Sequence, residues 1–206
     1  MKHLSIQLQK PHSNQQKVLE EAKRFNLLKC GRRFGKSTLS IYIASKALCQ
    51  GQSVAYFAPT YKDASEWWQE VTHRVKSLIV QKDSTLKQIK TMTGGKLDVW
   101  SFDNPDSGRG RKYHVVLVDE CEKGIKFKEA WTQSIRPTLT DYKGSAWFFS
   151  TPQFGRTFFK ELFNYQDKLK DWKSWRFTTY DNPYIDPAEV DAAKAELDPL
   201  TFACEY

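Results

Sequence analysis

Residues 30–38, CGRRFGKST, combine a glycine-bearing turn with a lysine and a hydroxyl at a spacing that suits phosphate binding. In such a loop, backbone N–H groups and the positive end of a helix surround a phosphate, the lysine neutralises charge and the hydroxyl ligates Mg²⁺. The pattern G-x-x-x-x-G-K-[ST] has glycine where Cys30 stands, so the match is imperfect, although a small side chain fits there. A chance Gly-Lys-Ser is the alternative. The sequence predicts a phosphate-binding loop (the P-loop), with Ser37 as a metal ligand and nucleotide contacts from Gly31, Arg33, Gly35, Lys36, Ser37 and Thr38.

A second segment, VVLVDE at residues 115–120, places two carboxylates at the end of an apolar strand. In α/β proteins, ligands and catalysts collect at this end of the strands. Asp119 can organise Mg²⁺ through its water shell, and Glu120 can orient and deprotonate a water in line with a γ-phosphate. A strand that ends in two solvated acids is the alternative. Both segments in this order favour a P-loop NTPase, and no Asn-Lys-x-Asp guanine-reading motif occurs, so ATP is the expected nucleotide.

The composition bears on partners and compartment. With 32 Lys+Arg and 24 Asp+Glu, the 206-residue chain has a net charge of +8, which favours a polyanion such as nucleic acid. Its apolar runs are far shorter than the ~20 residues of a membrane span. The N-terminal segment has no signal-peptide pattern, so we expect a soluble intracellular protein. The four cysteines and four histidines lack the spacing of a metal site of their own.

The two candidate segments need a scaffold that brings them to one edge of a sheet. Apolar runs that alternate with amphipathic stretches predict a doubly wound α/β fold, here a P-loop NTPase with a central, mainly parallel sheet flanked by helices. Strands are expected at 25–30, 54–58, 114–119 and 145–150, helices at 15–24, 61–80 and from Lys36 to Gly51, a hairpin around Gly94-Gly95, and a loop at 103–113. A shift in composition beyond Pro152 predicts an ATPase core over 1–152 and a small lid with the start of a linker over 153–206.

Several segments occur in an order that resembles one known family. They are GRRFGKST (31–38), FAPTY (57–61), NPDSGRGRKYHVVLVDE (104–120), SIRPTL (134–139), WFFSTPQFG (147–155) and TTYDNPYI (178–185). This set, from about residue 11 to the end, resembles the large terminase subunit of tailed bacteriophages, the ATP-driven motor that packages DNA. The resemblance implies an ATPase domain with a central parallel sheet and a lid subdomain. Because a metal-dependent nuclease domain follows in that family, we expect this chain to be the isolated motor domain, without nuclease activity.

The resemblance also gives roles to arginines in two loops. Arg32 matches the family's P-loop arginine, a donor of charge in cis to the γ-phosphate in the transition state, and Arg33 is the weaker candidate for this role. Arg109 resembles an arginine finger offered to the neighbouring subunit. Arg111 is close enough to compete, and either of these two can instead be a solvated loop cation. With Lys36 and Glu120, Arg32 and Arg109 form the expected catalytic set.

Two polar pairs acquire roles in the same way. Gln15 or its neighbour Gln16, before the first strand, resembles the glutamine that reads the edge of adenine, although either can be an ordinary helix-surface residue. Ser150 and Thr151, in a Ser-Thr-Pro sequence at a strand end, match the family's coupling motif, whose hydroxyls report hydrolysis to the lid. An ordinary strand terminator is the alternative for this pair.

The function that the resemblance implies is ATP hydrolysis with Mg²⁺, coupled to translocation of double-stranded DNA into a procapsid. The implied partners are double-stranded DNA, further copies of the chain in a homo-oligomeric ring, the portal protein and the small terminase subunit, in the host cytoplasm and with no membrane or mature virion involved. Residues 123–128 and Arg136 mix cations with an aromatic ring as DNA-tracking surfaces do, and a solvated face is the alternative. A helicase-like DNA-dependent ATPase, or a binding module with a vestigial nucleotide site, are the alternative functions.

Overall fold

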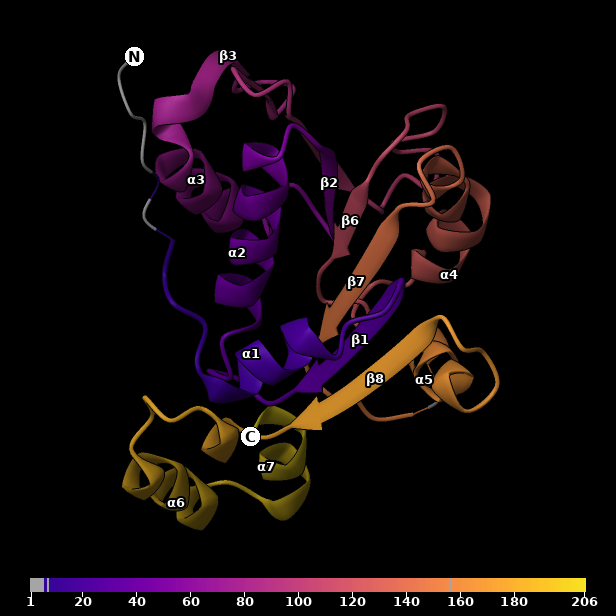
Figure 1. Cartoon of the computed structure of the whole chain (residues 1–206). Helices are drawn as coiled ribbons and strands as arrows, with labels where there is room; N and C mark the ends of the chain where they lie inside the picture. The colour runs from indigo at the N-terminus through magenta and orange to yellow at the C-terminus, as the bar shows by residue number, and fades with distance from the viewer. Residues whose placement is uncertain (1–5, 7, 156) are drawn as a thin grey trace.

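The computed structural model describes residues 6, 8–155 and 157–206, and an eight-stranded sheet forms its centre (Figure 1). The strand order is β3-β4-β5-β2-β6-β7-β1-β8. The strands from β5 to β8 in this order are parallel, and β4 and β3 extend the sheet antiparallel at one edge. The strands are β1 Phe25–Cys30, β2 Ser53–Ala58, β3 Ile79–Asp83, β4 Gln88–Thr91, β5 Lys96–Ser101, β6 Val115–Val118, β7 Ser145–Ser150 and β8 Trp172–Phe177. The mainly parallel sheet expected from the sequence is thus confirmed.

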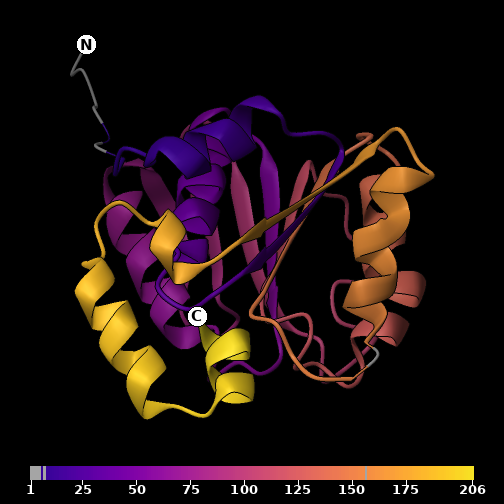
Figure 2. The same ribbon diagram turned by 90° about the horizontal axis from the view of Figure 1, so that it is seen from below.

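Two cores form, one on each face of the sheet, because successive strand residues point to opposite sides. In β2, for example, Tyr56 belongs to one core and Phe57 to the other. Figure 2 shows the sheet between the two groups of helices that cover these cores. We call the sides the α2 face and the α4 face. The α2 face carries α1 (Ser13–Glu20), α2 (Lys36–Cys49) and α3 (Ser65–Arg74), and the α4 face carries α4 (Phe127–Ala130) and α5 (Phe158–Phe163).

Two helices are shorter than the sequence pattern predicts. The first ends at Glu20 rather than at residue 24, and the helix expected over 61–80 is confined to α3, Ser65–Arg74. Thr60 and Asp63 exchange hydrogen bonds, which keeps the residues before α3 in a turn. After α3 the chain passes into β3, where the β-branched Ile79 pairs antiparallel with β4. Amphipathic spacing alone did not reveal that this apolar end continues as an edge strand.

The expected hairpin and the expected loop are both confirmed. β4 and β5 pair antiparallel around Gly94-Gly95, and residues 103–113 contain no helix or strand. Short 3-10 turns occupy Lys76–Leu78, Arg136–Leu139, Asn164–Asp167 and Thr179–Asp181, and a π-helical turn occupies Trp131–Ile135. Across the part of the chain that the structure describes, the helices are too short or too polar to cross a lipid bilayer.

The segment after Pro152 contributes to the central sheet as well as to its surroundings. β8 pairs in parallel with β1, from Phe25 opposite Trp172 to Cys30 opposite Phe177. The segment expected as lid and linker, 153–206, thus contains an edge strand of the central sheet. The last two helices, α6 (Pro187–Glu196) and α7 (Pro199–Glu205), lie beyond the end of the sheet where β8 terminates (Figure 1). The division of the chain into two domains at residue 152 stays a prediction.

Candidate nucleotide-binding site

The P-loop joins the end of β1 to the start of α2 through a backbone conformation that residues with a side chain rarely adopt. Gly35, at the N-cap of α2, has φ +99°, and Arg33 has φ +61°. A Cβ on Gly35 would lie 2.6 Å from Gln15 Nε2. Because only glycine takes this φ without a steric cost, and a Cβ would displace the end of the Gln15 side chain, the loop favours glycine at this position. The predicted turn and the helix start at Lys36 are thereby confirmed, and phosphate binding by the loop stays a prediction.

Lys36 connects the P-loop to the end of a strand more than one hundred residues away. Its Nζ donates to Cys30 O and to Gly31 O, both at 3.1 Å, and to Thr151 Oγ1 at 3.0 Å. The three donors of the ammonium group are therefore all used. β7, which leads to Thr151, lies between β1 and β6 in the sheet, so three candidate segments meet at one edge.

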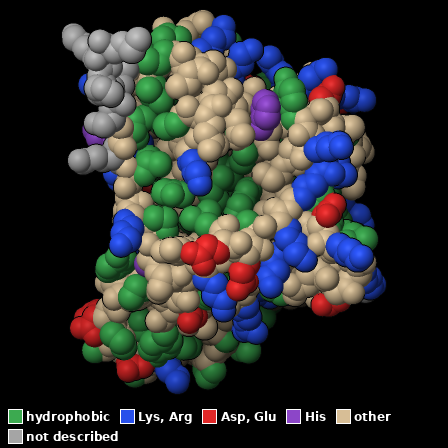
Figure 3. All heavy atoms as spheres, viewed as in Figure 1, with side chains coloured by type: hydrophobic (Ala, Val, Ile, Leu, Met, Phe, Trp, Pro, Cys, Tyr) green, Lys and Arg blue, Asp and Glu red, His purple; other side chains and the backbone are tan. Residues whose placement is uncertain are grey.

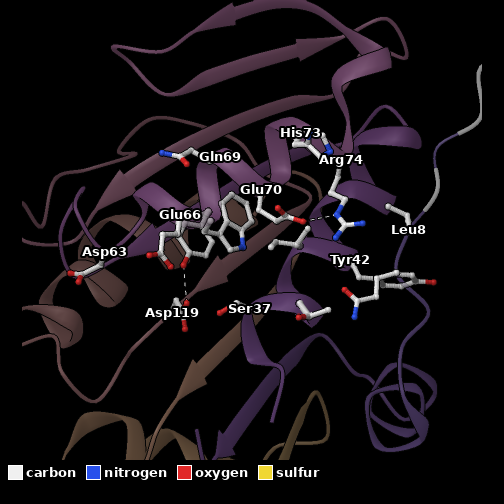
Figure 4. Close-up of a pocket in the computed structure, with 15 residues that line it drawn as sticks. Leu8, Ser37, Tyr42, Asp63, Glu66, Gln69, Glu70, His73, Arg74 and Asp119 are labelled. Atoms are coloured by element: carbon white, nitrogen blue, oxygen red, sulfur yellow. Dashed lines mark hydrogen bonds and ion pairs between the residues drawn. The ribbon is translucent and has the colours of Figure 1, made fainter. Parts of the chain in front are cut away.

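Asp119 lies on the same face of the sheet as α2. Val115 and Leu117 of β6 belong to the core of the α2 face, and the period of two along a strand continues to Asp119. Asp119 and Ser37 both line a cavity of about 640 Å³ between α2 and α3. Figure 4 shows their side chains close together at one end of this cavity, with His73 and Arg74 at the other end.

The carboxylate of Asp119 is held at both oxygens. Oδ2 accepts a hydrogen bond from Tyr56 Oη at 2.8 Å, and Oδ1 accepts one from its neighbour's backbone, Glu120 N, at 3.0 Å. Burial and then the charge of Glu120 raise the pKa of Asp119, and these hydrogen bonds and the charge of Lys36 oppose the rise. A carboxylate and a hydroxyl facing one cavity are the hard oxygen donors that Mg²⁺ prefers. Asp119 and Ser37 therefore fit the metal that the family implies.

Glu120 follows in a left-handed turn, with φ +49°. A residue other than glycine in this region costs of order 1–2 kcal/mol, and such strain collects at functional sites. Glu120 Oε2 lies 3.2 Å from Lys123 Nζ, and its side chain is 25% exposed. The turn thus separates the two neighbouring acids. Asp119 is fixed at the end of the central strand β6, whereas Glu120 lies in the loop that follows.

Ser150 and Thr151, expected to act together, point to opposite faces of the sheet. Thr151 meets Lys36 on the α2 face, whereas Ser150 Oγ accepts a hydrogen bond from Glu122 N at 3.0 Å. The Glu122 carboxylate in turn accepts a hydrogen bond from Thr157 Oγ1 at 3.1 Å and another from Gln153 N. Thr151 therefore belongs to the candidate site, and Ser150 with Glu122 ties the loop after β6 to the loop after β7.

Of the two glutamines, the structure brings only Gln15 to the P-loop. Gln15 is 3% exposed, and its Nε2 donates to Gly35 O at 3.0 Å. Gln16 is exposed and donates to Glu20 on the helix surface. His12 supports the same loop: its Nε2 donates to Phe34 O at 3.0 Å, which leaves Nδ1 to accept from Gln15 N and cap α1. The reading of adenine by a glutamine stays a prediction.

Neither P-loop arginine reaches the cavity in this structure. The guanidinium of Arg32 contacts the carboxylate of Glu205 on α7, and its side chain is 63% exposed. Arg32 N also donates to Glu205 O at 2.6 Å. Arg33 is exposed, and its carbonyl accepts from Asn182 Nδ2 at 2.6 Å. The catalytic role of Arg32 stays a prediction, and α7 is the element that now holds it.

The second pair of arginines projects from the 103–113 loop. Arg109 pairs with Asp106 of the same loop at 2.8 Å, and both side chains are exposed. The guanidinium of Arg111 lies 6.0 Å from the ring centroid of Trp100. Gly108 anchors the loop, since a Cβ there would lie 2.9 Å from Phe57 Cζ on the α4 face. The loop is thus fixed on the side of the sheet opposite to Lys36, and neither arginine lines the cavity.

Sequence reasoning missed several residues that shape the site. Tyr56 lies in an apolar strand and gives no polar signal of its own. Asn182 and Thr179 occur in the segment TTYDNPYI without a role of their own, yet Asn182 Nδ2 donates to Arg33 O and Thr179 Oγ1 donates to Arg32 O at 2.7 Å. Among the described residues, no group of three or more His, Cys, Asp or Glu side chains could hold a metal ion by itself.

Solved structures with a similar fold come from phage terminases. The large terminase ATPase domain of Thermus phage P74-26 has a TM-score of 0.81 at 22% identity, over 96% of this chain and 92% of that one. The large terminase of another thermophilic bacteriophage, in complex with ADP, has a TM-score of 0.70 at 15% identity, over 94% of this chain and 52% of that one. These likenesses establish the fold.

A sequence relative and a family model agree with the structural likeness. The large terminase subunit of Escherichia phage T5 is 29% identical over 196 residues, which are 92% of this chain and 44% of that protein. The chain thus spans less than half the length of this relative. The model of the family described as "Terminase large subunit, T4likevirus-type, N-terminal" matches residues 27–203. The chain therefore belongs to this family of large terminase subunits.

Proposed function

We propose that this chain is the ATP-hydrolysing motor domain of a viral DNA-packaging terminase, which couples hydrolysis to translocation of double-stranded DNA into a procapsid. The observation that carries the proposal is the convergence of Lys36, Ser37, Asp119 and Thr151 at one sheet edge, from segments far apart in the sequence. The family assignment and the ADP complex of the thermophilic phage terminase support it. The family and the solved structure favour packaging over a helicase-like role, because both are large terminases.

The chemistry follows from the positions of the side chains. The P-loop backbone and Lys36 would bind the phosphates, and Ser37 and Asp119 would hold Mg²⁺. When bound, Mg²⁺ would neutralise charge on the phosphate oxygens. Glu120, in the loop just beyond Asp119, orients and deprotonates the attacking water. In this function the chain hydrolyses ATP and translocates DNA, and it does not cleave DNA.

A neighbouring copy in a ring supplies the remaining charge. Arg109 is exposed and fixed on the α4 face, so it does not serve the cavity of its own chain. Offered to the next subunit, it would stabilise the charge that spreads over the transferred phosphoryl group. Arg111 is the alternative finger. Ring assembly, together with docking to a portal protein and a small terminase subunit in the host cytoplasm, remains part of this proposal.

The charge on the surface supports a nucleic acid partner. Lys and Arg side chains gather on the side of the molecule that carries α4 and the 103–113 loop (Figure 3). Phosphate contacts from such cations supply most of the sequence-independent affinity for DNA. Exposed cations in the 103–113 loop, on α4 and in the turn before α4 are Arg109, Arg111, Lys112, Lys123, Lys126 and Lys128.

Phosphate release by single variants tests the hydrolytic part. Glu120→Gln removes the general base, so we expect turnover to fall by about 10²-fold or more while ADP binding is retained. Lys36→Ala removes the phosphate ligand, so we expect ADP binding and turnover to fall together. Controls are Lys46→Ala, on the exposed side of α2, and Glu129→Gln on α4. Equal phosphate release from the parent chain and all four variants would contradict the proposal and favour a vestigial site.

A further inference from the structure

A buried hydrogen bond from Tyr56 fixes Asp119, one of the two proposed metal ligands. Tyr56 lies on β2, beside β6, where it stands opposite Leu117 in the parallel register. Its side chain is 1% exposed, and its hydroxyl donates to Asp119 Oδ2 at 2.8 Å. Tyr56 and Asp119 both line the cavity, and the nearly buried hydroxyl meets the carboxylate there.

Tyr56 is itself held in one orientation. Its ring stacks on Trp67 of α3, with ring centroids 3.8 Å apart and an interplanar angle of 10°. Trp67 Nε1 donates to Ser40 Oγ at 2.8 Å, and Ser40 Oγ donates to Ser37 O at 2.8 Å. The contacts therefore run from Asp119 through β2 and α3 back to the first turn of α2. The two proposed metal ligands, Ser37 and Asp119, stand at the two ends of this chain of contacts.

Such outer partners orient metal ligands in proteins, and their loss typically costs 10–100-fold in metal affinity. We propose that Tyr56 is a positioning residue that fixes Asp119 for metal–nucleotide binding, and that Trp67 and Ser40 keep Asp119 in register with Ser37. The inference rests on the proposed function, because it concerns the same metal site. It assigns to α3 a part in the site that the sequence segments alone do not indicate.

Tyr56→Phe tests this role, because it keeps the ring and its stacking and removes only the hydroxyl. The probes are Mn²⁺ and ADP. We expect the affinity for Mn²⁺ in the presence of ADP, measured by electron paramagnetic resonance, to fall by about 10-fold. Binding of ADP in EDTA, measured by titration calorimetry, stays within about twofold of the parent chain, because no phosphate contact is lost. Trp67→Phe, which removes the donor to Ser40, is the second variant, with a smaller loss in the same direction.

Tyr113→Phe is a matched control, because Tyr113, at the end of the 103–113 loop, pairs with Asp98 of β5 in the same sheet. Tyr113 is 2% exposed, and its hydroxyl donates to Asp98 Oδ2 at 2.6 Å, so the variant loses the same kind of buried pair away from the cavity. We expect it to lower the melting temperature without changing the affinity for Mn²⁺. Parental Mn²⁺ affinity in both Tyr56→Phe and Trp67→Phe, or an equal loss in Tyr113→Phe, would overturn the inference. Failure of the parent chain to bind Mn²⁺ and ADP at all would instead overturn the proposed function, and the inference with it.

Discussion

At the scale of single residues, the P-loop and its support depend on each other. Gln15 Nε2 donates to Gly35 O and occupies the space that a side chain at Gly35 would need. The glycine therefore does more than permit the turn: its missing side chain lets α1 come close enough to hold the loop. The left-handed Arg33 beside it, with φ +61°, shows that the loop keeps its shape even where glycine is absent.

Gly35→Ala is expected to disturb both the fold and the site. We expect a loss of roughly 1–3 kcal/mol in the free energy of unfolding, because alanine takes this backbone poorly and would collide with Gln15. Gly94→Ala is the control: Gly94 has φ +90°, and nothing lies within 4 Å of its ideal Cβ. Urea unfolding and ADP titration measure the effects. Because both glycines have positive φ, a larger loss of unfolding free energy in Gly35→Ala than in Gly94→Ala separates crowding against Gln15 from backbone strain. We expect ADP affinity to fall only in Gly35→Ala, and equal losses of unfolding free energy in both variants would contradict this reasoning.

At the scale of elements, α7 acts on the P-loop through Glu205. The Arg32 guanidinium that the family resemblance places at the γ-phosphate contacts this carboxylate instead. Because the arginine is 63% exposed, solvent screens the pair, which is worth about 0–1 kcal/mol at most. A contact this weak can be exchanged for one with a phosphate, so α7 is suited to release Arg32 when the site is filled.

Glu205→Gln should release Arg32 more easily. We expect the turnover of phosphate release to rise several-fold, with a melting temperature close to that of the parent chain, because an exposed ion pair contributes little to stability. Glu196→Gln, an exposed change near the end of α6, is the control. Unchanged turnover in Glu205→Gln, or an equal rise in both variants, would show that Glu205 does not restrain the arginine.

The elements also show what the sequence could reveal. Apolar runs and the Gly-Gly turn predicted β1, β2, β6, β7 and the hairpin, because burial on both faces and turn chemistry leave local signals. The length of α3 depends on the pairing of the residues after it with β4, and the place of β8 depends on pairing with β1, which is distant in sequence. Amphipathic or apolar spacing within one segment does not reveal either pairing. Lys36 and Asp119 were expected to lie together because each follows a strand whose local signal is clear. The contact of Tyr56 with Asp119, and the separation of Ser150 from Thr151, follow only from the register and faces of the folded sheet.

At the scale of the whole molecule, Lys36 lies on the α2 face and the Arg109 loop packs on the α4 face, so in the proposed motor a second copy would complete the site. A mixture of variants tests this directly. Arg109→Ala subunits keep Glu120, and Glu120→Gln subunits keep Arg109, so a ring that contains both kinds restores some complete sites. At subunit concentrations high enough for association, we expect phosphate release from the mixture to exceed that of either variant alone.

The same mixing experiment also distinguishes Arg109 from Arg111 as the arginine finger. Arg111→Ala, mixed in the same way with Glu120→Gln, serves as the matched variant, and only the arginine that acts across the interface shows both the loss alone and the rescue on mixing. Release from the Arg109→Ala mixture equal to the average of its two parents would rule out a finger at Arg109. Full turnover of the parent chain at high dilution would rule out a ring-completed site altogether.

The three donors of the Lys36 ammonium group are all satisfied by oxygens of the protein. Its ammonium group already has the oxygens of Cys30, Gly31 and Thr151 at 3.0–3.1 Å, so the protein itself supplies the substitutes for a polyphosphate. Each departing product can therefore be replaced by internal partners, and the loop need not collapse and re-form between cycles. Thr151 is the one partner of Lys36 that lies outside the P-loop, so in the proposed motor a phosphate that displaced this hydroxyl would pass its arrival to the tip of β7.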